Sequence, residues 1–350
     1  ELTVEKKKGL AVIRLNRPEA MNALSLEMIR LISAGLKKAN RDPEIKAVVL
    51  ASAGDRAFCA GGDVKLASRL GMAFRKGEIS NDIAGMYFRE EYKLDSEIFN
   101  FEKPIISLLN GITMGGGVGI GFPADYRVIT ENTIFAMPEV KIGFFPDVGG
   151  TYHLQKMPGR LGLFAAISGY HFKNSSDLIH LNVGTQFTNS AKLPNLLSDL
   201  AKNLADCPDD KVTSRIERVL DQFSDDPGEP GEIQENKDLL SNLMSGETFK
   251  DIYEAFHDNS NDFTREVCHL LHLASTTSLI VTYRYYNRNS GEEFETVLSR
   301  DARMVQHFIK GYDFYEGIRA VLKDKDEPMW QPPTLDEVTP DMIDEYFEDL

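Results

Sequence analysis

The most informative stretches of the sequence are two glycine-bearing loops: residues 57–63 read Ala-Phe-Cys-Ala-Gly-Gly-Asp, and residues 110–117 read Asn-Gly-Ile-Thr-Met-Gly-Gly-Gly. Each follows a short apolar run typical of a buried strand, at residues 47–51 and 105–109, and each precedes an expected helix. In an α/β layer both loops can lie at one edge of the sheet, close to each other. Their glycines would let the backbone approach a ligand and expose N–H groups to it, although either loop alone is better explained by ordinary turn and packing glycines.

Strands and helices alternate around these loops. The other expected elements are a hairpin at 2–5 and 10–13, a helix from Ser25 to about Asn40, a helix opened by Asp63, a helix from near Asn81 to Phe101, and strands at 126–129 and 133–136. After about residue 150 the pattern becomes mostly helical. We therefore expect an α/β core at residues 1–185, with the binding site, and a mostly helical C-terminal region at residues 186–350.

Composition restricts the function. The chain has 350 residues, with 39 Lys plus Arg against 54 Asp plus Glu, and its formal net charge is −15. We expect no nucleic-acid partner, because phosphate binding needs a basic face, and a polyanionic small ligand would need a local basic patch. No apolar run reaches about 18 residues, so no membrane-spanning helix is expected. The three scattered cysteines suit a reducing compartment, the bacterial cytoplasm or, as the alternative, the mitochondrial matrix.

Several weaker motifs favour ordinary structural roles. Cys268, His269 and His272 have helical spacing but lie in an apolar stretch without a partner pair, so packed core residues are preferred to a metal site. Residues 119–124 loosely match a dinucleotide-binding fingerprint, but Pro123 would disturb the helix that such a fingerprint opens. Cys59 could be a nucleophile, yet a small buried loop residue is the simpler interpretation.

Two carboxylates stand out in residues 137–150, which read Met-Pro-Glu-Val-Lys-Ile-Gly-Phe-Phe-Pro-Asp-Val-Gly-Gly. Glu139 and Asp147 lie eight apart in apolar surroundings bounded by prolines and glycines. A buried carboxylate is costly unless it is paired or functional, and burial raises its pKa toward the range useful in acid–base chemistry. The spacing alone leaves equal room for a surface glutamate and a helix-capping aspartate.

These three motifs, taken together, resemble the crotonase (enoyl-CoA hydratase/isomerase) superfamily in their order and spacing, from about Val4 to Ala166. Residues 111–119, 135–150 and 311–326, followed by Trp330, are similar to its 3-hydroxyisobutyryl-CoA hydrolase branch. The resemblance implies an α/β fold, a crotonase-like spiral of repeated β-β-α units forming two roughly perpendicular sheets, with a helical C-terminal region.

The resemblance also implies a site for an acyl-CoA thioester. By position, the backbone N–H groups of Gly62 and Gly116 become the oxyanion hole, and Glu139 and Asp147 become the catalytic, substrate-contacting acids. Glu91 corresponds to a substrate-contacting glutamate of the hydrolase branch, near the β-hydroxyl. Hydratases of the family carry a second glutamate where this chain has Gly119, which puts two-glutamate water addition in doubt.

The expected activity is therefore hydrolysis of a short-chain 3-hydroxyacyl-CoA, above all 3-hydroxyisobutyryl-CoA, to 3-hydroxyisobutyrate and CoA in valine degradation. The alternative is an enoyl-CoA or dienoyl-CoA isomerase, or a hydratase, on the same fold. A non-catalytic acyl-CoA binder is a third hypothesis, disfavoured because both acids are present. No metal or redox cofactor is expected, since a thioester is already electrophilic and CoA is part of the substrate. The sequence leaves open whether the protein forms a homo-oligomer, because the oligomeric states of family members range widely.

Overall fold

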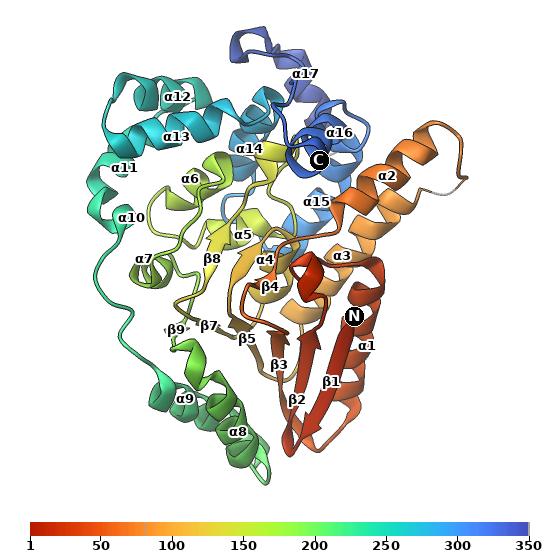
Figure 1. Ribbon diagram of the computed structural model, residues 1–350, viewed down its shortest axis with the longest axis vertical. Helices are drawn as coiled ribbons and strands as arrows, with labels where there is room; N and C mark the ends of the chain where they lie inside the picture. The colour runs from red at the N-terminus through yellow and green to blue at the C-terminus, as the bar shows by residue number, and fades with distance from the viewer. Residues whose placement is uncertain (81, 349–350) are drawn as a thin grey trace. The chain divides into compact units, whose positions relative to one another are not determined.

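The computed structural model describes residues 1–80 and 82–348, and their contacts form two compact units (Figure 1). Unit 1 comprises residues Glu1–Gly62, Lys93–Phe135 and Phe172–Glu235. Unit 2 comprises residues Asp63–Tyr92, Ala136–His171 and Asn236–Leu350. Each unit thus combines three separate stretches of the chain. The boundary expected after residue 185 is a boundary along the sequence, and it stays a prediction.

Unit 1 contains a six-stranded sheet in the order β1-β2-β3-β5-β7-β9. Its strands are β1 (Leu2–Lys7), β2 (Gly9–Leu15), β3 (Ile45–Ser52), β5 (Ile105–Leu109), β7 (Tyr126–Ile129) and β9 (Gln186–Phe187). β1 and β2 form the antiparallel hairpin expected around the Lys-Lys-Lys-Gly turn, and the pairings from β2 to β9 are parallel. The hairpin and the buried strands predicted from the sequence are confirmed.

A three-stranded sheet in the order β4-β6-β8 provides the second layer of the fold. Its strands are β4 (Ala57–Cys59), β6 (Ile112–Met114) and β8 (Ile134–Ala136). Along the chain each follows a strand of the large sheet and precedes a helical segment, respectively α2 (Val64–Arg75), α4 (Gly116–Gly121) and the short 3₁₀ helix η2 (Glu139–Ile142). This is the repeated β-β-α order of the expected spiral.

Helices cover the large sheet and close the core of unit 1. Alternate residues such as Leu10 and Val12 of β2 share one face of the sheet, and they pack with the apolar side chains of α8 (Leu193–Leu204) and α9 (Val212–Phe223). Ser25 accepts a hydrogen bond from Met28 N–H and caps α1 (Leu26–Arg41), as expected. The other helical segments of unit 1 are η1 (Pro18–Ala20), α7 (Ser175–His180), η3 (Ser190–Lys192), η4 (Asp209–Lys211) and α10 (Glu232–Glu235).

Unit 2 is mostly helical, as expected for the chain beyond residue 150. Besides α2 and η2 it contains α3 (Ile83–Phe99) as far as Tyr92, α5 (Gly150–Leu154), α6 (Leu161–Ser168), α11 (Lys237–Leu243), α12 (Phe249–Asp258), α13 (Asp262–His272), α14 (Thr276–Arg288), α15 (Phe294–Phe308), α16 (Asp313–Gly317), the π-helix η5 (Ile318–Asp324), η6 (Leu335–Glu337), α17 (Pro340–Asp344) and η7 (Glu345–Phe347). Asp63 caps α2, as predicted. The helix expected from near Asn81 begins at Ile83, and Asn81 itself lies outside the described residues.

Aromatic side chains form the part of the unit 2 core that holds the segment between the two predicted acids. Phe144 stacks on Phe88 with ring centroids 5.4 Å apart, and Phe145 stacks on Phe308 at 5.0 Å. Both phenylalanines are at most 2% exposed. The Phe-Phe pair therefore fixes the middle of residues 139–147 in the core. Across the residues that the structure describes, no helix combines the length and apolarity needed to cross a membrane.

Candidate active site

The two glycine loops meet in unit 1. β4 and β6 pair in parallel, with Ala57 opposite Ile112, which brings the segments that follow them side by side. A Cβ added at Gly61 would lie 3.4 Å from Met114 O and 3.9 Å from Gly116 N, and one added at Gly117 would lie 2.2 Å from Cys59 O. At Gly61 and at Gly117, the backbone of one loop therefore lies directly against the backbone of the other. The expectation that the two loops lie close together is confirmed.

Gly116 begins the helix that follows the second loop. Gly115 precedes it with a φ of +48°, and the Gly115 carbonyl accepts hydrogen bonds from Val118 N–H and Gly119 N–H. The first amides of a helix have no acceptor within the helix, so the geometry of α4 directs the Gly116 N–H outward from its own hydrogen-bond ladder. Gly62 follows Gly61, and the Gly61 carbonyl accepts a hydrogen bond from Leu24 N–H at 2.9 Å.

Unit 2 brings together the three acids that the sequence singled out. Glu91 lies on α3, Glu139 opens η2, and Asp147 precedes α5; all three are at most 5% exposed. No Lys or Arg in the described part of the chain forms an ion pair with any of them. Among the same residues, one carboxylate oxygen of Glu91 (Oε1) and one of Glu139 (Oε2) have no hydrogen-bond partner. The cluster is therefore buried without compensating positive charge.

Burial perturbs the protonation of this cluster. It raises the pKa of Glu139 well above its ordinary value, and the negative charges of Asp147 and Glu91 raise it further. The pKa of Glu91 is also raised, first by burial and then by the charge of Asp147, while a hydrogen bond from Tyr87 lowers it. Burial raises the pKa of Asp147 to about 7, against a lowering by hydrogen bonding to Tyr92. Like charges in such a site share protons, so the cluster holds protons near neutral pH.

Tyr92 is a site residue that the sequence reasoning missed. Its hydroxyl donates to Asp147 Oδ2 at 2.7 Å, and its ring is buried. Burial and the nearby carboxylates raise the pKa of Tyr92, so the phenol keeps the proton that it donates. Its position directly after Glu91 is a weak signal, because neighbouring residues on a helix point about 100° apart. Only the fold shows that Tyr92 binds Asp147 and that the charge of Asp147 acts on Glu91.

Residues from the C-terminal helices hold the turn that begins at Glu139. Ser275 N–H donates to Val140 O at 3.0 Å, and the Ser275 hydroxyl donates to Asp313 Oδ2 at 2.6 Å. Gly143 has a φ of +65°, and a Cβ there would lie 2.2 Å from Asp313 O. A glycine is thus required at this close backbone approach.

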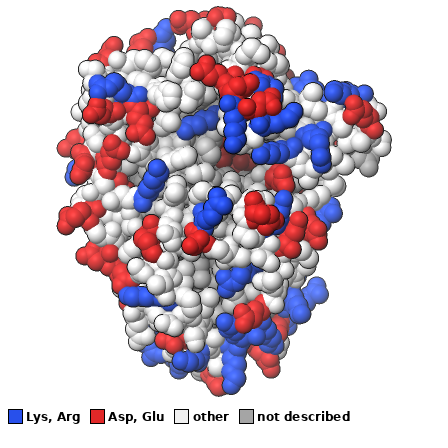
Figure 2. Space-filling model, in the orientation of Figure 1, with Lys and Arg blue, Asp and Glu red and all other residues white. Residues whose placement is uncertain are grey.

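Unit 2 also contains a pocket of about 1110 Å³ between α2 and the segment from Tyr312 to Lys323. Figure 2 shows Lys and Arg side chains gathered over α2 and α16. The basic residues that line the pocket are Lys65, Arg69, Arg75, Lys76, Arg319 and Lys323. In a chain with a net charge of −15, this is the local basic patch that a polyanionic ligand would need. None of the predicted site residues lines this pocket or a second one, of about 1250 Å³.

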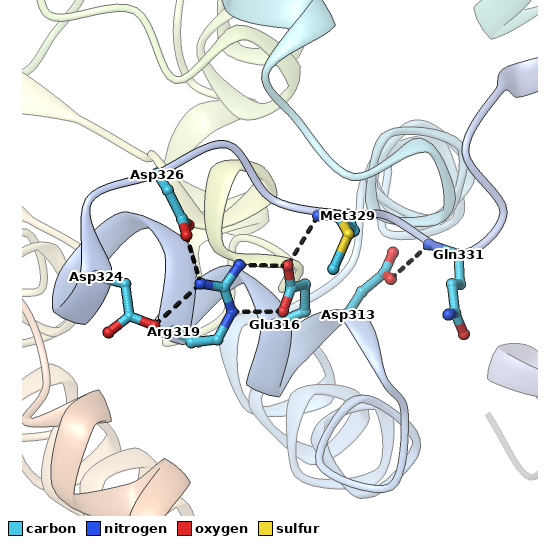
Figure 3. A network of polar contacts seen from close by, with 7 residues as sticks. All are labelled: Asp313, Glu316, Arg319, Asp324, Asp326, Met329 and Gln331. Atoms are coloured by element: carbon cyan, nitrogen blue, oxygen red, sulfur yellow. Dashed lines mark hydrogen bonds and ion pairs between the residues drawn. The ribbon is translucent and has the colours of Figure 1, made fainter.

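One cation of this pocket is already neutralised, as Figure 3 shows. Arg319 binds both oxygens of Glu316, at 2.7 and 2.8 Å, and also Asp324 and Asp326 at 3.0 and 2.8 Å. Glu316 also accepts Met329 N–H at 2.8 Å, so the network ties α16 to the returning chain. Arg319 therefore stabilises the C-terminal segment. Within the described residues, Lys65, Arg69, Lys76 and Lys323 have no carboxylate partner of this kind.

The metal motif rejected from the sequence gains no geometric support. Cys268 and the two neighbouring histidines lie on α13, and Cys268 is a free thiol. Nowhere in residues 1–80 and 82–348 do three or more His, Cys, Asp or Glu side chains form a group that could hold a metal ion.

Comparison with known proteins gives relatives over the full length of the chain. The family described as enoyl-CoA hydratase/isomerase matches residues 10–347. A 3-hydroxyisobutyryl-CoA hydrolase, mitochondrial, from Xenopus tropicalis is 41% identical over 97% of this chain and 86% of its own. The human protein of the same name is 38% identical over 100% of this chain and 89% of its own. A carnitinyl-CoA dehydratase from Mycobacterium thermoresistibile is similar in structure, with a TM-score of 0.88, 31% identity, and 100% and 96% coverage.

Proposed function

The chain belongs to the enoyl-CoA hydratase/isomerase family, and on that premise we propose that it hydrolyses 3-hydroxyisobutyryl-CoA to 3-hydroxyisobutyrate and CoA. The observation that carries the proposal is the burial of Glu139 and Asp147 in one cluster without a cation. The names of the curated relatives support the same substrate. Gly119, within α4, supplies no second glutamate, which favours hydrolysis over water addition to a double bond.

The backbone of the glycine loops would stabilise the charge that develops on the thioester. When a nucleophile attacks the carbonyl carbon, the carbonyl oxygen becomes an oxyanion, and two N–H groups aimed at it lower the barrier. We assign these donors to Gly62 and Gly116. Glu139 either attacks the carbonyl itself, giving a mixed anhydride that water then cleaves, or removes a proton from the attacking water. Hydrolysis in ¹⁸O-water, followed by mass analysis of the Glu139 peptide, tests the anhydride route, because ¹⁸O enters the Glu139 carboxylate only when water attacks its carbonyl carbon in the anhydride.

Asp147 would manage the proton of the reaction. With a pKa of about 7, its carboxyl can hold a proton near neutral pH and give it to the departing thiolate of CoA. The Tyr92 hydroxyl, 2.7 Å from Oδ2, orients the carboxyl while this proton moves. Glu91 would accept a hydrogen bond from the β-hydroxyl of the substrate, and its buried Oε1, which has no partner in the described residues, supports this role.

The basic pocket of unit 2 would bind the phosphates of CoA. Lys65, Arg69, Lys76 and Lys323 are exposed, line the pocket, and have no carboxylate partner in the described residues. Charged hydrogen bonds to phosphate contribute more than neutral ones, so Arg69→Gln with Lys323→Gln should raise KM for the acyl-CoA about tenfold or more. The same double variant should have an unchanged KM for the corresponding pantetheine thioester, which lacks the nucleotide phosphates. Lys237→Gln, an exposed cation on α11 outside the pocket, is the control.

The names of the relatives support the alternative compartment rather than the bacterial cytoplasm expected from the sequence. The curated relatives are named as mitochondrial proteins, and the chain's three cysteines are free thiols. We place this chain in the mitochondrial matrix, the alternative expectation, where a reduced thiol is stable. Localisation of the tagged full-length protein tests this.

A panel of short acyl-CoA esters, assayed for thiol release, tests the activity. We expect fast CoA release from 3-hydroxyisobutyryl-CoA and slow release from isobutyryl-CoA. Glu139→Gln, which keeps the shape of the side chain, is the background control. Conversion of an enoyl-CoA without release of free CoA would contradict the proposal and indicate the isomerase or hydratase alternative.

A further inference from the structure

The turn that carries Asp147 has an unusual backbone. Gly150 N–H donates to Asp147 O at 2.7 Å, which closes a four-residue turn. Its two central residues both have positive φ, +55° at Val148 and +69° at Gly149, as in a type I′ turn. Glycine adopts this conformation easily, but valine is β-branched and is strained there. Such a conformation persists only when surrounding contacts hold it.

Asp301 makes the contact that holds this turn. Gly149 N–H, which the turn's own hydrogen bond does not use, donates to Asp301 Oδ2 at 2.7 Å. Asp301 lies on α15 and is completely buried, and its Oδ1 accepts the Tyr285 hydroxyl at 2.6 Å. A buried amide without an acceptor would be costly, so the turn and the Asp301 carboxylate depend on each other.

We propose that Asp301 is a positioning residue for the reaction: by accepting Gly149 N–H it keeps the strained turn in the conformation that presents Asp147. Asp147 is then held in two ways: Tyr92 binds its carboxylate, and Asp301 binds Gly149 N–H in the turn that Asp147 begins. This inference rests on the proposed function, because it gives Asp147 a part in thiol release. The parent protein is assayed first, so a failure of the proposed function shows as no thiol release in the parent.

The test compares Asp301→Ala with Asp177→Ala. Asp177 is also a buried aspartate whose carboxylate accepts backbone N–H groups, from Ile233 at 3.1 Å and Gly231 at 3.2 Å, but it lies in unit 1. We expect Asp301→Ala to lower kcat about a hundredfold with little change in KM, since small misplacements of a reacting group have effects of this size. Asp177→Ala should keep kcat close to that of the parent. Equal kcat values in the two folded variants, or a loss confined to KM, would overturn the proposal.

Two further variants separate positioning from a general loss of packing. Val148→Gly in the Asp301→Ala background relieves the strain while removing packing, so it should recover kcat about tenfold; a further fall in kcat would overturn the proposal. Asp301→Asn keeps an oxygen acceptor for Gly149 N–H and should retain most of the kcat. If Asp301→Ala does not fold, the kcat of Asp301→Asn tests the proposal instead. A kcat as low as that of Asp147→Asn would then show that the charge of Asp301, rather than its contact with the turn, is what matters.

Discussion

The glycine loops of unit 1 and the acidic turns of unit 2 are positioned in different ways. In unit 1, the pairing of β4 with β6 and backbone contacts such as Gly117 against Cys59 O place the loops. In unit 2, single side chains hold the acidic turns: Asp301 binds Gly149 N–H, and Tyr92 binds Asp147. Backbone donors need only regular secondary structure and room, whereas buried carboxylates need partners for each polar group.

This difference predicts how substitutions in the glycine loops and in the acidic turns should reduce the activity. A change in a glycine loop should act by removing a donor or by adding bulk against backbone. A change in unit 2 should act through charge, protonation or the loss of one partner. The predictions below test this contrast.

The largest effect is expected at the acid pair. Glu139→Gln and Asp147→Asn keep the side-chain shapes and remove the charges, so both variants should fold, bind an acyl-CoA, and lose about 10²–10⁴ in kcat. The double variant should be little worse than the poorer single one, because residues that act as a unit are not additive. Kinetics of thiol release measure this. Fully additive losses would mean that the two acids act independently.

The next effect concerns the proposed oxyanion donor at Gly116. Gly116→Pro removes its N–H, while proline is otherwise accepted at the first position of a helix such as α4. Loss of one such donor costs about 2.7–4 kcal/mol in the transition state, or 10²–10³ in kcat. Circular dichroism confirms the fold, and thiol release gives the rate. A folded variant with normal turnover would exclude this N–H from the reaction.

A smaller effect is expected at Glu91. A site that hydrogen-bonds a hydroxyl rejects analogues without it, so the native protein should strongly prefer 3-hydroxyisobutyryl-CoA to isobutyryl-CoA. Glu91→Ala should narrow the ratio of kcat/KM values by about tenfold or more. Glu78→Ala, which removes an exposed acid of the same unit, should leave the ratio unchanged. Full preference in Glu91→Ala would show that another group selects the substrate.

The last prediction concerns stability rather than reaction rate. The pKa of Asp147 is raised from an ordinary value of 3.8 to about 7 in the folded protein, so its protonated form favours folding. That contribution is complete below about pH 4 and is lost as the pH rises through 7. Asp147→Asn does not titrate, and its free energy of unfolding should exceed that of the parent by an amount that grows from pH 4 to pH 8, up to about 4 kcal/mol.

Urea denaturation at several pH values measures this difference in stability. Asp258→Asn, at an exposed position of the same unit, should show no such growth. A difference that is the same at pH 5 and pH 8 would contradict the raised pKa.

Much of the fold and part of the site could be predicted from the sequence. Strand and helix periodicity, the caps at Ser25 and Asp63, and the two glycine loops depend on interactions within a few residues. Glu91, Glu139 and Asp147 were identified as site candidates, and the structure buries all three in unit 2. Their roles in the reaction stay predictions until the variants above are measured.

The tertiary structure alone decided which residues support the acids. Tyr92 lies 55 residues from Asp147, and Gly149 lies 152 residues from Asp301, so no local pattern connects them. An aspartate at position 301 does interrupt the apolar stripe of α15 formed by Val297, Met304, Val305 and Phe308, which marks it as unusual without naming its partner. Local sequence determines secondary structure because its hydrogen bonds are local. A carboxylate's pKa and orientation depend on burial and on distant partners, and these exist only once the chain has folded.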